Sequence, residues 1–241
     1  MEKNGGGYEV IEWNETNCDL QCNNYIKKAV EYKNWAFVSD YFRLRALYEF
    51  GGIYLDTDVE VYKSFDDLLN KKGFVGYMHD ALIGTAVLGF EKENLFIKKL
   101  LDLYDNAEWI EGKYDLFRIK FENGDSYLCN ANNSVFTWAV FHFYDNFKLN
   151  GNYQETADFS VFPKTEFEIG TFWGKRSHCV HRCESSWKTK NNKKELYKIV
   201  KNAVKYIPVI HMDAIIRNIS YEKHMQKSVF YERYLHDTAS A

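Results

Sequence analysis

Proline is scarce in this 241-residue chain, which contains two, and cysteine occurs five times. With so little proline, no Pro-rich linker divides the sequence. An odd number of cysteines fits a reducing compartment better than a secreted disulfide framework. No apolar run is long enough to span a bilayer, and the start MEKNGGGYEV lacks the apolar segment of a signal peptide. These absences predict a cytoplasmic protein.

The chain also lacks an excess of positive charge. Its 31 Lys and Arg face 34 Asp and Glu, for a formal net charge of −3, which argues against nucleic acid as a partner. The charge is uneven, because the segment from Lys188 onward holds 11 Lys or Arg against 5 Asp or Glu. Such a segment suits contact with an anionic surface and equally suits a solvated helix face. The region from Lys188 to Lys205 is therefore our candidate for peripheral contact with the inner membrane.

Aromatic residues are abundant, with 18 Tyr, 18 Phe and 6 Trp, and they help to place the secondary structure. Apolar positions three and four residues apart, followed by Gly51-Gly52, make 37–52 the clearest helix. Further helices are expected at 22–36, 93–107, 133–147 and 193–207, followed by a helical tail. Strands are expected at 8–15, 53–62, 73–80 and 81–91, with a strand and turn at 159–169 and irregular structure at 178–188.

Strands and helices alternate over most of the length, and this order favours an α/β sandwich. We expect residues 1–190 to form one domain. Residues 191–241 would then be a C-terminal helical extension of that same domain. No internal repeat is present, so the pattern does not suggest a solenoid or a propeller.

The stretch YEFGGIYLDTDVEV places Asp56 and Asp58 one residue apart at the end of an apolar segment. In an extended strand, residues i and i+2 point the same way, so the two carboxylates would share one face. Two carboxylates roughly 4–6 Å apart repel by a few kcal/mol at an effective dielectric near 20. A divalent cation reverses that cost, and oxygen ligands favour Mg²⁺ or Mn²⁺. A solvated acidic turn is the plain structural alternative.

Asp40 and Arg43 precede this segment on the predicted helix, on one face at i and i+3. If Asp40 and Arg43 formed only a surface ion pair, the pair would contribute little to stability. A functional interpretation gives Arg43 a phosphate or sugar partner and lets Asp40 accept hydrogen bonds from hydroxyl groups. The spacing alone does not separate the two.

The stretch FVSDYFRLRALYEFGGIYLDTDVEVYKSFDDLL closely resembles the core of glycosyltransferase family 32. These are DxD sugar transferases with the Rossmann-like GT-A fold, a mixed central sheet flanked by helices. The S-D-x-x-R and G-G-x-Y-L-D-x-D layout is also similar to the catalytic domain of the large clostridial glucosylating toxins. The resemblance covers roughly residues 8–190, because ALIGTAVLGFEKENLFIKKLL and VHRCESSW resemble later family segments.

The resemblance implies roles for particular residues. Arg43, Asp56 and Asp58 would be catalytic, and the metal ligands for Mn²⁺ or Mg²⁺ would be Asp56, Asp58 and His181. The residues implied to bind the sugar nucleotide are Asp40, Arg43, Tyr54, Asp56, Thr57, Ser186 and Trp187.

The resemblance also implies an activity. Family members move a sugar from a nucleotide donor, usually UDP-linked, to a glycan or lipid-linked glycan acceptor, and they retain the anomeric configuration. Many serve capsular or surface polysaccharide synthesis, which would place this enzyme in the cytoplasm at the inner membrane. Family members usually begin with a further strand that forms part of the nucleotide pocket. We expect the sheet here to lack that N-terminal strand, which leaves the base specificity open.

Three alternatives stay open. Cys18, Cys22, Cys179 and Cys183, with His178 and His181, could make a zinc site, although their spacing is looser than that of a zinc ribbon. The DxD after an apolar strand also suits a phosphohydrolase. A degenerate domain that binds sugar nucleotides or glycans without catalysis is the third.

Overall fold

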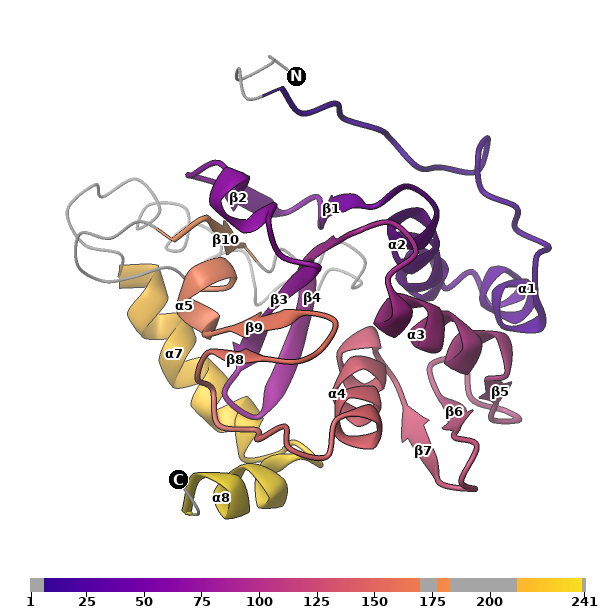
Figure 1. Ribbon diagram of the computed structural model, residues 1–241. Helices are drawn as coiled ribbons and strands as arrows, with labels where there is room; N and C mark the ends of the chain where they lie inside the picture. The colour runs from indigo at the N-terminus through magenta and orange to yellow at the C-terminus, as the bar shows by residue number, and fades with distance from the viewer. Residues whose placement is uncertain (1–6, 170–176, 183–211, 240–241) are drawn as a thin grey trace, which may run out of the picture.

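A mixed sheet of five strands, in the order β1-β4-β3-β9-β8, forms the centre of the structure (Figure 1). Its strands are β1 (Gly52–Leu55), β3 (Gly73–His79), β4 (Leu82–Phe90), β8 (Gln154–Glu155) and β9 (Ser160–Phe162). β3 and β9 run parallel, and the other neighbours are antiparallel. The computed structural model describes the backbone of residues 7–169, 177–182 and 212–239, and the side chains of all of these except 212–218.

The β3–β4 hairpin is buried on both faces, which explains its nearly continuous apolar sequence. Val75, Tyr77 and Leu88 point into the larger core, which the helices on one face complete. Phe74 and Val87, one residue out of phase, point into a smaller cluster with Phe167. The helices of the larger core are α1 (Asn24–Glu31), α2 (Trp35–Phe50), α3 (Leu95–Asp105) and α4 (Asn132–Phe143).

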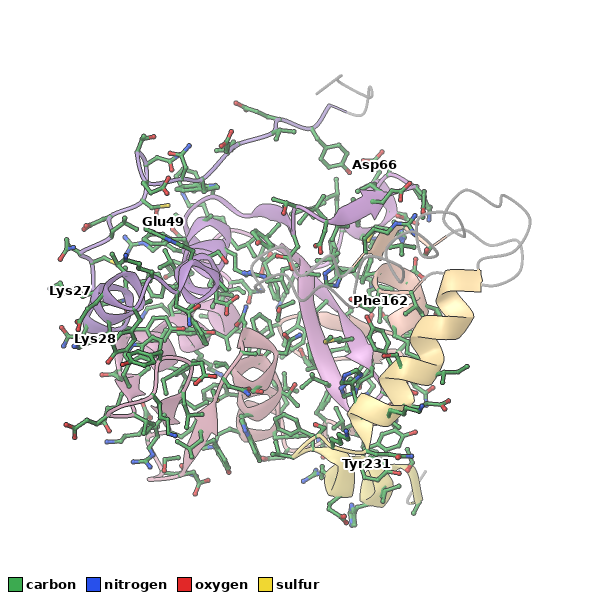
Figure 2. All side chains as sticks on the ribbon, turned by 180° about the vertical axis from the view of Figure 1, so that it is seen from behind. Lys27, Lys28, Glu49, Asp66, Phe162 and Tyr231 are labelled. Carbon is green, nitrogen blue, oxygen red and sulfur yellow. The ribbon has the colours of Figure 1, made fainter. Side chains whose placement is uncertain are left out.

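The opposite face of the sheet is covered by α5 (Lys164–Phe167) and α7 (Met212–Met225), as both views show (Figures 1 and 2). After α7 the chain turns into α8 (Tyr231–Ala239) and packs back on the larger core. There Phe230 lies 4.6 Å from the ring centroid of Trp138, and Asp237 accepts a hydrogen bond of 2.8 Å from the Leu149 N–H. The end of the chain therefore shares the main core.

Two smaller sheets complete the described structure. One pairs β2 (Val59–Val61) with β10 (Cys179–His181), and the 3₁₀ turn η1 (Asp66–Leu68) follows β2. The other contains β5 (Glu108–Trp109), β6 (Phe117–Lys120) and β7 (Ser126–Cys129). No helix among the described residues is both long and apolar enough to cross a bilayer.

Most of the predicted elements are present, and the mixed α/β architecture with helices flanking the central sheet is confirmed. Three expectations were wrong, and one sheet was missed. Residues 8–15 are not a strand, and the strand expected at 53–62 breaks into β1 and β2. The three-stranded sheet after α3 was not predicted, and β10 lies where irregular structure was expected. The helix expected at 193–207 and the domain boundary at 190/191 lie outside the described residues, so both stay predictions.

Gly51 sets the angle at which the chain leaves α2 and enters β1. Its φ of +70° lies in the left-handed region, and its N–H caps the helix by bonding the Leu47 carbonyl at 2.8 Å. A Cβ at this position would lie 2.7 Å from the backbone nitrogen of Lys92. Glycine is therefore required here by both conformation and space, and the position of β1 depends on it.

We predict that Gly51→Ala will lower the free energy of unfolding by about 1–3 kcal/mol more than Gly124→Ala does. Both glycines have positive φ, so both substitutions carry the conformational cost. Only Gly51 would also bring a methyl group against backbone, because nothing lies within 4 Å of a Cβ at Gly124. Urea denaturation of the two variants measures the difference, and equal losses would contradict the steric argument.

Candidate active site

Asp56 and Asp58 lie in a tight turn between β1 and β2, not on one continuous strand. The Asp56 N–H still bonds the Ala86 carbonyl on β4 at 2.8 Å, and the Val59 N–H bonds the Asp56 carbonyl at 3.0 Å. Asp-Thr-Asp suits such a turn better than a strand. The predicted i, i+2 strand geometry is thus wrong for this pair. Asp56 does directly follow the carboxyl end of β1, which is an edge strand antiparallel to β4.

Pairing of β10 with β2 brings His181 to this turn from more than 120 residues away along the sequence. His181 lies opposite Val59 in the ladder, and the Arg182 N–H bonds the Asp58 carbonyl at 2.8 Å. As a result, His181 Nε2 lies 3.2 Å from Asp58 Oδ1. The structure therefore places the His181 and Asp58 side chains together, as the sequence analysis expected.

Asp56, Asp58 and His181 each present a ligand atom, and the three atoms lie within 4.8 Å of one another. Their side chains are partly exposed, at 27%, 21% and 16%. Across residues 7–169, 177–182 and 219–239, no other cluster of three or more His, Cys, Asp or Glu has this spacing. These three side chains are close enough to ligate one metal ion together, and carboxylate oxygens are donors that suit Mn²⁺ and Mg²⁺.

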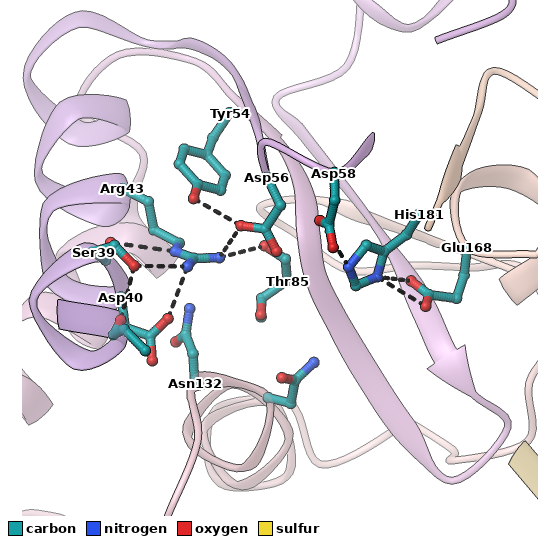
Figure 3. A network of polar contacts seen from close by, with 12 residues as sticks. Ser39, Asp40, Arg43, Tyr54, Asp56, Asp58, Thr85, Asn132, Glu168 and His181 are labelled. Carbon is teal, nitrogen blue, oxygen red and sulfur yellow. Dashed lines mark hydrogen bonds and ion pairs between the residues drawn. The ribbon is translucent and has the colours of Figure 1, made fainter. Parts of the chain in front are cut away.

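Arg43 connects this turn to helix α2 (Figure 3). Its Nη1 donates to Asp56 Oδ1 at 3.1 Å and to the Thr85 carbonyl at 2.9 Å, while its Nη2 lies 2.9 Å from Asp40 Oδ1. Tyr54 donates to the same Asp56 oxygen at 2.8 Å, and its ring lies 4.5 Å from the guanidinium carbon. The Arg43 side chain is 7% exposed, so it is a buried cation that fixes both carboxylates.

Burial dominates the electrostatics of Asp40. It raises the pKa of this carboxyl from 3.8 to about 6, against the opposing effect of Arg43 and with a further raising contribution from Asp56. Although burial alone would lower the pKa of Arg43, the neighbouring Tyr54, Asp40 and Asp56 raise it, so the guanidinium stays charged. Asp40 can therefore take up a proton in mildly acidic solution.

Two residues at the site were not predicted. Asn132 lies at the start of α4 with its side chain buried, and its backbone N–H has a small lowering effect on the pKa of Asp40. Its Oδ1 accepts a hydrogen bond from Tyr104, but among the described residues its Nδ2 has no partner. Glu168 lies behind His181, with carboxylate oxygens 3.0 and 3.1 Å from Nδ1. Neither residue belongs to a recognisable motif. For Asn132 the sequence signal is the run NANNS at the start of a predicted helix, and Glu168 has no comparable signal.

The other predicted site residues divide into two groups. Tyr54 and the exposed Thr57 lie at the turn. Ser186, Trp187 and the Lys-rich region lie outside the described residues, so their assignments stay predictions.

A cysteine-based zinc site has no support among the described residues. Cys179 is buried, and its thiol bonds the Phe167 carbonyl at 3.5 Å. Burial raises the pKa of this thiol, which disfavours the thiolate that zinc requires. Cys183 lies outside the described part of the chain.

Residues 1–75 match the family model described as "Glycosyltransferase sugar-binding region containing DXD motif". The matched segment contains Asp40, Arg43, Asp56 and Asp58. The chain is similar to glycosyltransferases with a DXD motif. The mixed sheet with flanking helices is consistent with the GT-A-like domain that such a family implies.

An uncharacterized protein of Arabidopsis thaliana is 39% identical over 138 residues, which cover 54% of this chain and 20% of that protein. The chain thus spans about a fifth of the length of this curated relative. No solved structure matches the chain significantly. The narrower resemblance to family 32 and to the clostridial toxins stays a prediction.

We predict that Asp40→Asn will change how stability depends on pH. Because the pKa of Asp40 is higher in the folded chain than its ordinary value, its contribution is fully present below about pH 4 and lost as pH rises through about 6. The unfolding free energy of the variant, minus that of the wild type, should rise by on the order of 2–3 kcal/mol between pH 4 and 7. Urea denaturation at several pH values measures this.

The exposed Asp115→Asn provides the control for a surface Asp-to-Asn change. A constant difference between Asp40→Asn and wild type across the pH range would contradict the raised pKa.

Proposed function

We propose that the chain is a metal-dependent glycosyltransferase that moves a sugar from a nucleotide-sugar donor to an acceptor hydroxyl. The observation that carries the proposal is the convergence of Asp56, Asp58 and His181 to within 4.8 Å, next to the buried Arg43. The similarity of residues 1–75 to DXD-motif glycosyltransferases supports it independently.

Asp56, Asp58 and His181 would hold Mn²⁺ or Mg²⁺. When bound, the ion would neutralise charge on the donor diphosphate as the sugar leaves. The residues fit an ion in donor type as well as in spacing. Asp56 and Asp58 supply carboxylate oxygens and His181 supplies an imidazole nitrogen, and their ligand atoms converge at the turn.

Arg43 contributes by positioning as well as by charge. Held by Asp40, Asp56 and the Thr85 carbonyl, its guanidinium fixes one Asp56 oxygen and leaves the second oxygen for a ligand. Contact of Arg43 with a donor phosphate or sugar stays part of the proposal, because a guanidinium binds phosphate oxygens in a bidentate way. Tyr54 covers the guanidinium and would lie beside the donor.

The finer features of the proposal follow the resemblance to family 32. The donor would be UDP-linked, the acceptor a glycan or a lipid-linked glycan, and the product would retain the configuration of the donor sugar. Ser186 and Trp187 would close over the donor, and the Lys-rich region would hold the enzyme near the inner membrane, where surface polysaccharides are made. The sequence names no convincing carboxylate for a double displacement, which favours attack by the acceptor from the leaving-group face.

A phosphohydrolase is less well supported by the geometry. In open α/β sheets, ligands bind beyond the carboxyl ends of parallel strands, whereas β1 is an antiparallel edge strand. A domain that binds sugar nucleotides without turnover would need the same metal residues. Turnover is therefore what separates a transferase from a binding domain.

We predict that Asp58→Ala and His181→Ala will lower Mn²⁺-dependent hydrolysis of the donor by at least about 100-fold, because each removes a ligand of the ion. Donor hydrolysis across UDP- and GDP-linked sugars, with Mn²⁺ or with chelator, measures this activity. Asp66→Ala is the control, since this exposed carboxylate contacts Tyr8 and not the turn.

Unchanged turnover in a folded Asp58→Ala protein would refute the proposal. Binding of UDP with Mn²⁺ by the wild type, without hydrolysis or transfer to any acceptor tested, would favour the non-catalytic binding domain. Hydrolysis of simple phosphate esters without sugar-nucleotide turnover would favour the phosphohydrolase.

A further inference from the structure

Behind the candidate metal site lies a carboxylate that the proposed reaction does not use. Glu168 is the C-cap residue of α5 and is 4% exposed, and its carbonyl accepts a hydrogen bond of 3.1 Å from the His181 N–H. Its side chain also meets His181, with Oε1 and Oε2 at 3.0 and 3.1 Å from Nδ1. One residue thus holds His181 by both main chain and side chain.

Helix α7 contributes a second residue to this arrangement. The hydroxyl group of Tyr221 donates to Glu168 Oε1, and its side chain is 7% exposed. A buried carboxylate is costly unless hydrogen bonds satisfy it, and Tyr221 and His181 both do so. Successive contacts therefore connect Tyr221 on α7 to Glu168, Glu168 to His181, and His181 to Asp58. Figure 3 shows Glu168, His181 and Asp58.

We propose that Glu168 and Tyr221 are positioning residues that hold His181 in the tautomer able to ligate a metal, an inference that rests on the metal-dependent function proposed above. A carboxylate at Nδ1 can only accept, so Nδ1 carries the proton. In the neutral ring, Nε2 then keeps its lone pair, and Nε2 is the atom that faces Asp58. A carboxylate behind a histidine ligand also raises its basicity and fixes the plane of its ring.

A neighbouring pair on the same two elements offers a matched comparison. Glu166, also on α5, contacts Nδ1 of His178, which lies just before β10, at 2.5 Å. His178 Nε2 lies 2.7 Å from Asp67, so carboxylates bracket this ring, and it is not part of the Asp56–Asp58 cluster. Glu166 and His178 therefore join η1, α5 and β10 without facing the metal site. Glu166→Gln disturbs the same junction but should leave metal binding unchanged.

The test measures binding of Mn²⁺ alone to the full chain, using the electron paramagnetic resonance signal of free Mn²⁺. Glu168→Gln should weaken binding about 10- to 100-fold, the usual effect of removing a carboxylate behind a metal-bound histidine. Tyr221→Phe should weaken it less, by about threefold, because Glu168 stays in place. Glu166→Gln should bind as the wild type does.

Pulsed resonance then reports whether nitrogen ligates the ion. The wild type should show ¹⁴N coupling to bound Mn²⁺, which Glu168→Gln should weaken or lose and Glu166→Gln should keep. A merely structural role would lower the melting temperature of Glu168→Gln without changing its Mn²⁺ affinity or its ¹⁴N coupling. That result would overturn the inference.

Two further outcomes separate this inference from the proposed function. Should Glu168→Gln fail to fold, Tyr221→Phe decides, and wild-type affinity in that variant overturns the positioning role. A wild-type chain that binds no Mn²⁺ overturns the metal assignment itself. Strong wild-type binding with no effect of Glu168→Gln overturns the positioning role and leaves the metal site standing.

Discussion

Repulsion between carboxylates at one edge of the sheet is the constraint on which the rest of the site depends. Asp40 and Asp56 pair with the cationic Arg43, and Asp58 and Glu168 both contact His181. Arg43 neutralises the Asp40 and Asp56 side. On the other side, the imidazole ring of His181 lies between Asp58 and Glu168. A cation bound at this turn would lower the repulsion between the Asp56 and Asp58 carboxylates. This supports the proposed metal site over a solvated acidic turn.

The fold brings these groups together from separate elements. β4 anchors Asp56 through a backbone hydrogen bond, and helix α2 supplies Arg43 from beneath the turn. β10, α5 and α7 then fix His181 through the contacts of Glu168 and Tyr221. The contacts that hold the site therefore come from the sheet, from α2, from α5 and from α7. Through Glu168 and His181, helix α7 is thereby linked to the turn that carries Asp58.

The sequence was informative where a residue's role is local. Asp56 and Asp58 are recognisable by the glycine stop and apolar strand before them, and the helix carrying Arg43 by its periodicity. The same local view extended the strand through the DxD, because alternation cannot show where backbone pairing to β4 stops. The role of Glu168 could not be predicted either, because its partner His181 is distant in sequence and the local stretch TEFEIG does not indicate the contact. Neither the β2–β10 pairing nor the Tyr221 contact leaves a short-range pattern, so both had to come from the structure.

The most direct test of the account is the anomalous scattering of crystals soaked in Mn²⁺ and recorded on either side of the manganese absorption edge. The account predicts one strong anomalous peak within bonding distance of an Asp56 oxygen, an Asp58 oxygen and His181 Nε2. Well-ordered crystals with no peak there, or with His181 turned away from an ion bound elsewhere, would contradict it.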